Sequence, residues 1–123
     1  MSNKEDLRIV LKKVGKIPEI MNIENTLEAK QELVGGLIEV VSGLKDDILL
    51  VCNEEGKLTN LLPNLMFDFD YFAGDCFFVG DDYDNGDFKS LTDEQINEVY
   101  DICNKREIIN LFKLEESDGK EFD

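Results

Sequence analysis

The sequence predicts an α+β fold: a mostly antiparallel sheet of five or six strands with two helices packed on one face. Short apolar runs of strand length recur along the chain, and residues 48–52 (ILLVC) are the clearest of them. Residues 25–28 (NTLE) and 92–95 (TDEQ) instead have the pattern of a helix start. Apolar residues make up 42% of the 123 residues, which is enough to form the core of one domain.

The first part of the chain predicts two strands and a helix. Residues 7–12 and 19–23 are rich in branched apolar side chains, and Pro18 places the second strand at a strand end or a sheet edge. We expect Asn25 to cap the helix that follows, because its side chain can accept a hydrogen bond from a free backbone N–H. The Gly35-Gly36 pair ends this helix, since glycine adopts the left-handed conformation of a helix cap at low cost.

The middle of the chain predicts two more strands and a hairpin. Residues 37–41 and 48–52 form strands on either side of a polar turn, and the continuous apolar character of the second is typical of a central strand. The stretch from Asn53 to Gly56 is a tight turn with glycine at a position of positive φ. Residues 57–61 then return as the partner strand.

The second half of the chain predicts two strands and a second helix. Residues 66–71 alternate aromatic and acidic side chains like a short edge strand, and residues 75–79 form another strand. A capping box at Thr92 starts a helix with one apolar stripe, formed by Ile96, Val99, Tyr100 and Cys103. Residues 107–114 extend this helix or form a last strand.

These elements make one domain over residues 1–114, and we expect the acidic tail at 115–123 to be disordered. No apolar run is long enough to span a membrane and the chain does not start like a signal peptide, so we expect a cytoplasmic protein. The chain has no histidine, which excludes a Cys–His nucleophile within it. Apolar neighbours indicate buried, reduced thiols at all three cysteines, which are Cys52, Cys76 and Cys103.

Charge is the strongest global signal. The formal net charge is −15, with 28 acidic against 13 basic residues. No basic residue lies between Lys57 and Lys89, whereas that stretch contains seven aspartates: Asp68, Asp70, Asp75, Asp81, Asp82, Asp84 and Asp87. Such a surface repels nucleic acid and acidic membranes, and it attracts basic patches on proteins.

Residues 77–88 (FFVGDDYDNGDF) raise the question of a metal-binding loop. An EF-hand needs ligands and a glycine at fixed positions, and neither a start at Asp81 nor one at Asp82 fits that spacing. Asn85-Gly86 is instead a strong turn dipeptide. We therefore expect a hairpin turn here and no dedicated metal site, with weak adventitious Ca²⁺ or Mg²⁺ binding as the alternative.

Asp68 and Asp70 have the spacing of one face of a strand, where paired carboxylates could act in acid–base chemistry or bind a metal. The simpler interpretation is that they keep an aromatic edge strand soluble. Aromatic side chains beside acids also suit the binding of a basic protein groove. We therefore expect one acidic partner-binding face centred on residues 66–87, formed by Asp68, Phe69, Asp70, Tyr71, Asp81, Asp82, Asp84 and Asp87.

Several stretches carry a family resemblance: NTLEAKQELVGG (25–36), LIEVV (37–41), VCNEEGK (51–57), AGDCFFVG (73–80), GDF (86–88) and SLTDEQ (90–95). Over these stretches the chain resembles the small uncharacterised proteins of the domain of unknown function 3846. The resemblance implies an origin in phages or mobile elements of Gram-positive bacteria, and an interaction with host machinery or host defence. It implies no activity and no catalytic residues.

Three classes of function follow. The preferred one is an interaction protein whose acidic face binds a basic surface of a host protein, such as a nucleic-acid-processing or defence protein, by charge mimicry. The second is a small-ligand-binding protein in which Lys12, Lys13 and Lys16 hold an anion. The third, an enzyme with carboxylates and a divalent metal, is the least favoured, so we expect no catalytic residue and no cofactor. The oligomeric state is left open.

Overall fold

A computed structural model describes residues 6–108 of the chain. Its elements are, in chain order, β1 (Asp6–Lys12), β2 (Glu19–Glu24), α1 (Leu27–Val34), β3 (Ile38–Lys45), β4 (Ile48–Asn53), β5 (Pro63–Met66), β6 (Tyr71–Ala73), β7 (Cys76–Asp82), β8 (Asp87–Lys89) and α2 (Asp93–Arg106). The tail predicted for 115–123, and most of the segment predicted for 107–114, lie outside the described residues.

The main sheet is antiparallel, with strand order β2-β1-β7-β4-β3 and with β8 paired to one end of β7. β5 and β6 form a separate two-stranded sheet. β7 lies at the centre, where Phe78 is opposite Val10 on one side and Leu50 on the other. The first five residues of β7 are buried, which fits a strand covered on both faces.

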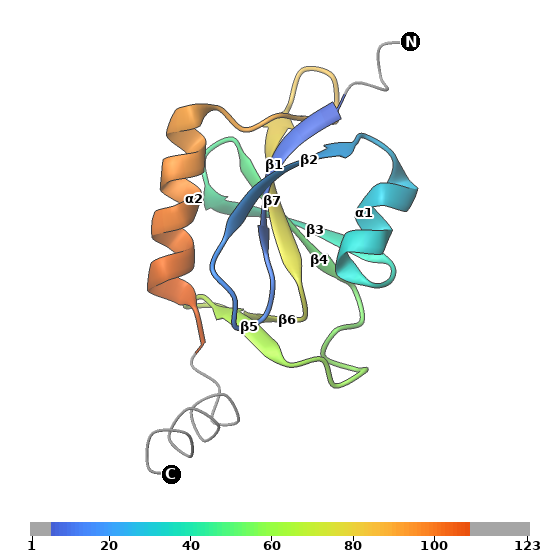
Figure 1. The fold of residues 1–123 in the computed structure, drawn as a ribbon, viewed down its shortest axis with the longest axis vertical. Helices are drawn as coiled ribbons and strands as arrows, with labels where there is room; N and C mark the ends of the chain where they lie inside the picture. The colour runs from blue at the N-terminus through green and yellow to red at the C-terminus, as the bar shows by residue number, and fades with distance from the viewer. Residues whose placement is uncertain (1–5, 109–123) are drawn as a thin grey trace.

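The two helices lie on opposite faces of the sheet, so the protein has three layers (Figure 1). Ile96, Val99 and Cys103 of α2 pack in one core cluster, which includes Phe78. Val34 of α1 packs in a second cluster, which includes Phe77. The α+β class and the antiparallel sheet are confirmed, but the prediction that both helices share a face is wrong. Residues 48–52 of β4 and 76–79 of β7 are apolar in succession, so both faces of the sheet require a cover there.

The helix ends follow the sequence signals closely. α2 begins with the predicted capping box between Thr92 and Gln95. α1 begins one residue later than expected, because Thr26 is its N-cap and its Oγ1 accepts a hydrogen bond from the Ala29 N–H at 3.1 Å. The amide oxygen of Asn25, the cap expected from the sequence, accepts a bond from Lys30 Nζ instead. α1 ends at Gly35 in the left-handed conformation, as predicted.

The predicted hairpin after β4 is wrong. Residues 54–60 form successive turns, and no strand occupies 57–61. Gly56 does not have a positive φ; its role is a close approach, because a Cβ there would lie 2.7 Å from the carbonyl oxygen of Ala73. β3 is also longer than expected, since it continues through a bulge at Gly43 to Lys45.

The three cysteines are buried and free, as their apolar neighbours predicted. Burial raises the pKa of Cys52 and of Cys103 to about 12, and it raises the pKa of Cys76 as well. Among the described residues, no helix is long and apolar enough to cross a membrane.

Candidate functional site

The residues predicted to form one acidic face fall in two groups at opposite ends of the main sheet (Figure 1). The first group lies between β5 and β6 and contains Asp68, Phe69, Asp70 and Tyr71. The second lies at the β7–β8 hairpin and contains Asp81, Asp82, Asp84 and Asp87. β7 runs from one end to the other, and its seven residues span about 20 Å at the usual strand rise. The structure therefore presents two surfaces where the sequence predicted one.

The acids of the first group have internal partners. Residues 66–71 are not one strand: β5 ends at Met66, and the Phe67 N–H donates to the Asp70 carbonyl to close the loop. Asp68 pairs with Arg106 at 3.3 Å, and Asp70 pairs with Lys57. The hydrogen bond from Lys57 holds the pKa of Asp70 below its usual value. The negative charge of the loop between β5 and β6 is thus largely neutralised by these two basic side chains.

Aromatic side chains dominate the same loop. Phe69 is 64% exposed, and its ring lies 6.0 Å from that of Phe67 and 6.5 Å from that of Phe72. Lys57 Nζ lies 4.5 Å from the ring centre of Tyr71, a cation–π distance. Exposed Phe69 therefore packs in an aromatic cluster, and the ring of Tyr71 is already in contact with Lys57.

The second group belongs to a larger acidic surface, because the β3–β4 turn, the β7–β8 hairpin and the start of α2 meet there. The carbonyl of Asp47, a residue with φ of 62°, accepts bonds from the Asp81 N–H at 3.0 Å and from Gln95 Nε2 at 3.2 Å. We call this surface the acidic end and define it by Asp46, Asp47, Asp81, Asp82, Asp84 and Asp87. Within residues 6–108, none of these six carboxylates takes part in an ion pair.

Tyr83 stands at the tip of the acidic end and is 68% exposed. The negative charge of Asp47, followed by partial burial and the charge of Asp81, raises the pKa of the Tyr83 phenol. An aromatic side chain thus lies within the negative field of Asp46, Asp47 and Asp81. Tyr83, Asp46 and Asp47 were not predicted as site residues, although the sequence places Asp46-Asp47 in a predicted turn and Tyr83 in a predicted hairpin.

The loop at residues 83–86 is a hairpin turn, as predicted. The Asn85 N–H donates to the Asp82 carbonyl, and the Gly86 N–H donates to the Tyr83 carbonyl. Gly86 has φ of 63°, and Asn85 Nδ2 donates to Asp82 Oδ2 at 2.8 Å. No group of three or more acidic or cysteine side chains that could hold a metal ion occurs in the part of the chain that the structure describes.

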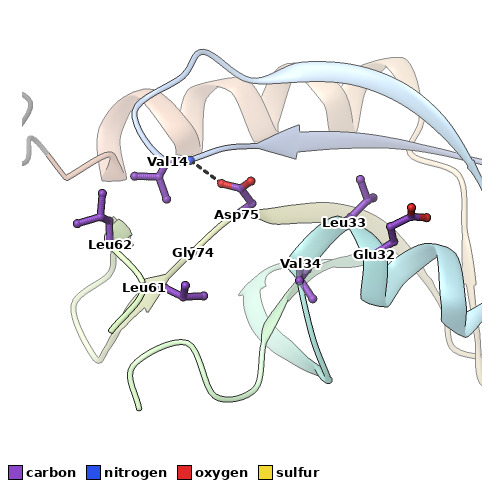
Figure 2. Close-up of a pocket in the computed structure, with 9 residues that line it drawn as sticks. Val14, Glu32, Leu33, Val34, Leu61, Leu62, Gly74 and Asp75 are labelled. Carbon is purple, nitrogen blue, oxygen red and sulfur yellow. Dashed lines mark hydrogen bonds between the residues drawn. The ribbon is translucent and has the colours of Figure 1, made fainter. Parts of the chain in front are cut away.

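A pocket of about 400 Å³ lies between the end of α1 and the β6–β7 connection (Figure 2). Its walls are mostly apolar and come from Val14, Leu33, Val34, Leu61 and Leu62, while Glu32, Gly35, Gly74 and Asp75 complete the lining. Asp75 Oδ1 accepts a hydrogen bond from the Val14 N–H at 2.9 Å, which ties the β1–β2 turn to the start of β7. A Cβ at Gly74, whose φ is 87°, would lie 2.6 Å from Leu61 Cδ1.

The three lysines expected to hold an anion do not form a common site. Lys12 is fully buried, and its Nζ donates to the Lys13 carbonyl at 2.9 Å, to Asn64 Oδ1 at 3.2 Å and to Glu107 Oε2 at 3.4 Å. Lys13 and Lys16 are exposed in the β1–β2 turn. Lys12 is thus a structural residue, which removes the central cation of that hypothesis.

The comparison with protein families gives a match to the family described as "Domain of unknown function (DUF3846)", over residues 7–104. The chain belongs to this family. The match runs from β1 to near the end of α2, so it includes both the acidic end and the pocket. No curated protein and no solved structure matches the chain.

Proposed function

We propose that this member of the DUF3846 family is an interaction protein, not an enzyme, and that its acidic end binds a basic surface of another protein. The observation that carries this proposal is the exposure of Tyr83 among six aspartates that form no ion pair within residues 6–108. Aromatic side chains are frequent anchors of protein interfaces, and surrounding charge steers the partner and selects its sign.

The acidic end is a better candidate than the loop between β5 and β6. Asp68 and Asp70 would have to give up Arg106 and Lys57 before they could pair with a partner. The aspartates of the acidic end have no ion pair within residues 6–108 that would have to break before they bind a partner. The net charge of −15 also repels nucleic acid, so the partner is a protein with basic residues.

The proposal includes the biological setting that the family resemblance implies. In a phage or mobile element, a cytoplasmic protein of this kind would act on a host protein that processes nucleic acid or defends the cell. A cluster of aspartates at a hairpin tip would then compete with the phosphates that such a partner normally binds. Binding of this type weakens as salt concentration rises, because salt screens the charges.

The test is affinity capture from host lysate at low and high salt, followed by binding measurements with the purified partner. Tyr83→Ala and the double variant Asp46→Asn/Asp84→Asn should each weaken binding at least tenfold, about 1.4 kcal/mol. Asp46 and Asp84 are exposed, and their side chains form no hydrogen bond or ion pair within the described residues, so the fold should be unaffected.

Asp68→Asn/Asp70→Asn is the matched control, because it removes the same amount of charge from the opposite end of the sheet. The proposal predicts that this control binds like the wild type. Equal losses in both double variants would show that only net charge matters. A loss confined to Asp68→Asn/Asp70→Asn would move the interface to the β5–β6 loop, and either result refutes the acidic end as the site.

A further inference from the structure

We propose that the pocket between α1 and the β6–β7 connection is a second binding site, and that its ligand is a small aliphatic amine: a hydrocarbon chain that ends in an ammonium group. The inference does not rest on the function proposed above. The pocket lies by Gly74 and Asp75, at the start of β7, whereas the acidic end lies at the other end of that strand.

The apolar part of the pocket fits a hydrocarbon chain. Leu33 and Val34 from the last turn of α1 form one wall, and Leu61 and Leu62 form the other (Figure 2). Leu61 and Leu62 are 36% and 49% exposed, so a ligand that covers them removes apolar surface from water. Gly74 lies between the walls, and the absence of a side chain there lets Leu61 pack closely over the backbone, because a Cβ would lie 2.6 Å from Leu61 Cδ1.

The charged part of the pocket fits a cation. The carboxylate of Asp75 is half-buried at one side, and Glu32 is exposed at the rim. The C-terminal end of α1 adds partial negative charge, and its last turn contains no basic residue to offset it. No lysine or arginine is among the described residues that line the pocket; Lys13 and Lys16 are exposed in the turn beside it.

The combination selects the ligand class. A fatty acid would fill the apolar walls but place its carboxylate against Asp75 and the helix end, which is unfavourable. An alcohol would fill the apolar part of the pocket but would gain no attraction to the negative charge of Asp75. An aliphatic ammonium ion satisfies both parts, because its charge can meet Asp75 while its chain covers the leucines.

The experiment is a titration of the full ¹⁵N-labelled chain by NMR with pentylammonium, pentanol and pentanoate at the same pH and ionic strength. Pentylammonium should shift the amide signals of Gly35, Gly74 and Asp75, and it should bind at least fivefold more tightly than pentanol. Pentanoate should produce no localised shift. Pentanoate binding equal to or tighter than pentylammonium binding would overturn the inference, as would the absence of localised shifts with all three probes.

Two substitutions identify the groups that act. Asp75→Asn keeps an oxygen that can accept from the Val14 N–H, so the fold is preserved while the charge is lost, and pentylammonium binding should fall at least fivefold. Asp84→Asn removes the same charge from the acidic end and should leave the affinity unchanged. If both variants lose affinity equally, the amine responds only to net charge and the pocket is not a site; the acidic-end proposal is unaffected by that result.

Discussion

Replacing Lys12 by methionine tests the buried network that joins β1, β5 and the end of α2. Lys12 is one of the largest fully buried side chains of the described residues. Its ammonium group has three oxygen partners, on Lys13, Asn64 and Glu107. Asn64 is itself 1% exposed, and its Nδ2 donates to the carbonyls of Lys12 and Gly74 at 2.8 and 2.9 Å. The network therefore depends on both side chains.

The magnitude follows from what methionine leaves behind. It fills a similar volume, so no large cavity forms. Asn64 Oδ1 loses its donor while it remains buried, which costs about 1–3 kcal/mol. The side chain of Glu107 is 30% exposed, so water can replace part of its lost ion pair, and the variant no longer has to desolvate an ammonium group. We expect the free energy of unfolding to fall by about 2 kcal/mol, and Tm by about 8 °C.

Urea unfolding followed by circular dichroism measures this change. Lys13→Met is the control, because it removes the same charge from the adjacent, exposed position. The control should stay within about 0.5 kcal/mol of the wild type. If Lys12→Met is as stable as Lys13→Met, the hydrogen bonds of the buried ammonium do not stabilise the fold and the reasoning is wrong.

Three further predictions concern the core and the elements around it. The free energy of unfolding should decrease as pH rises from about 9 towards 12, because folded Cys52 and Cys103 keep their protons while the unfolded thiols ionise; urea titrations at pH 8 and 10 should show a smaller decrease for Cys52→Ala. Thr92→Ala removes the capping box of α2 and should lower stability by about 1 kcal/mol in urea titrations, whereas an unchanged midpoint would mean that the box is energetically silent. Gly80→Ala should lower stability by about 1–3 kcal/mol in the same assay, because its Cβ would lie 2.7 Å from the Lys89 carbonyl oxygen; wild-type stability would show that β7 and β8 can separate without cost.

Local patterns in the sequence were sufficient for most single elements. The capping box at Thr92, the glycine end of α1 and the Asn85-Gly86 turn depend on a few neighbouring residues, and each was predicted correctly. The face that each helix covers depends on the whole sheet instead. The apolar runs of β4 and β7 indicate that both faces need a cover, but which helix covers which face depends on the strand order of the sheet.

The candidate site shows the same division. The sequence identified the aspartates and the exposed aromatic character, but it grouped residues by their distance along the chain. Pairing of Ile48 with Gly80 brings the β3–β4 turn next to the β7–β8 hairpin, and this contact joins Asp47 to the surface around Tyr83. Conversely, the length of β7 separates Asp70 from Asp81, although few residues lie between them. Neither relation can be derived before the strand order is known.

The central position of β7 has a consequence for how the chain is made. The β1–β2 and β3–β4 hairpins each form from neighbouring segments, but among the strands of residues 6–108 it is β7 alone that pairs with both β1 and β4. During synthesis the two hairpins therefore cannot join into one sheet until β7, which ends at residue 82, has left the ribosome. A chain that stops before residue 76 keeps the apolar strands β1 and β4 with unpaired edges, the form from which intermolecular strand pairing starts. We therefore expect prematurely terminated chains to aggregate more readily than the finished protein.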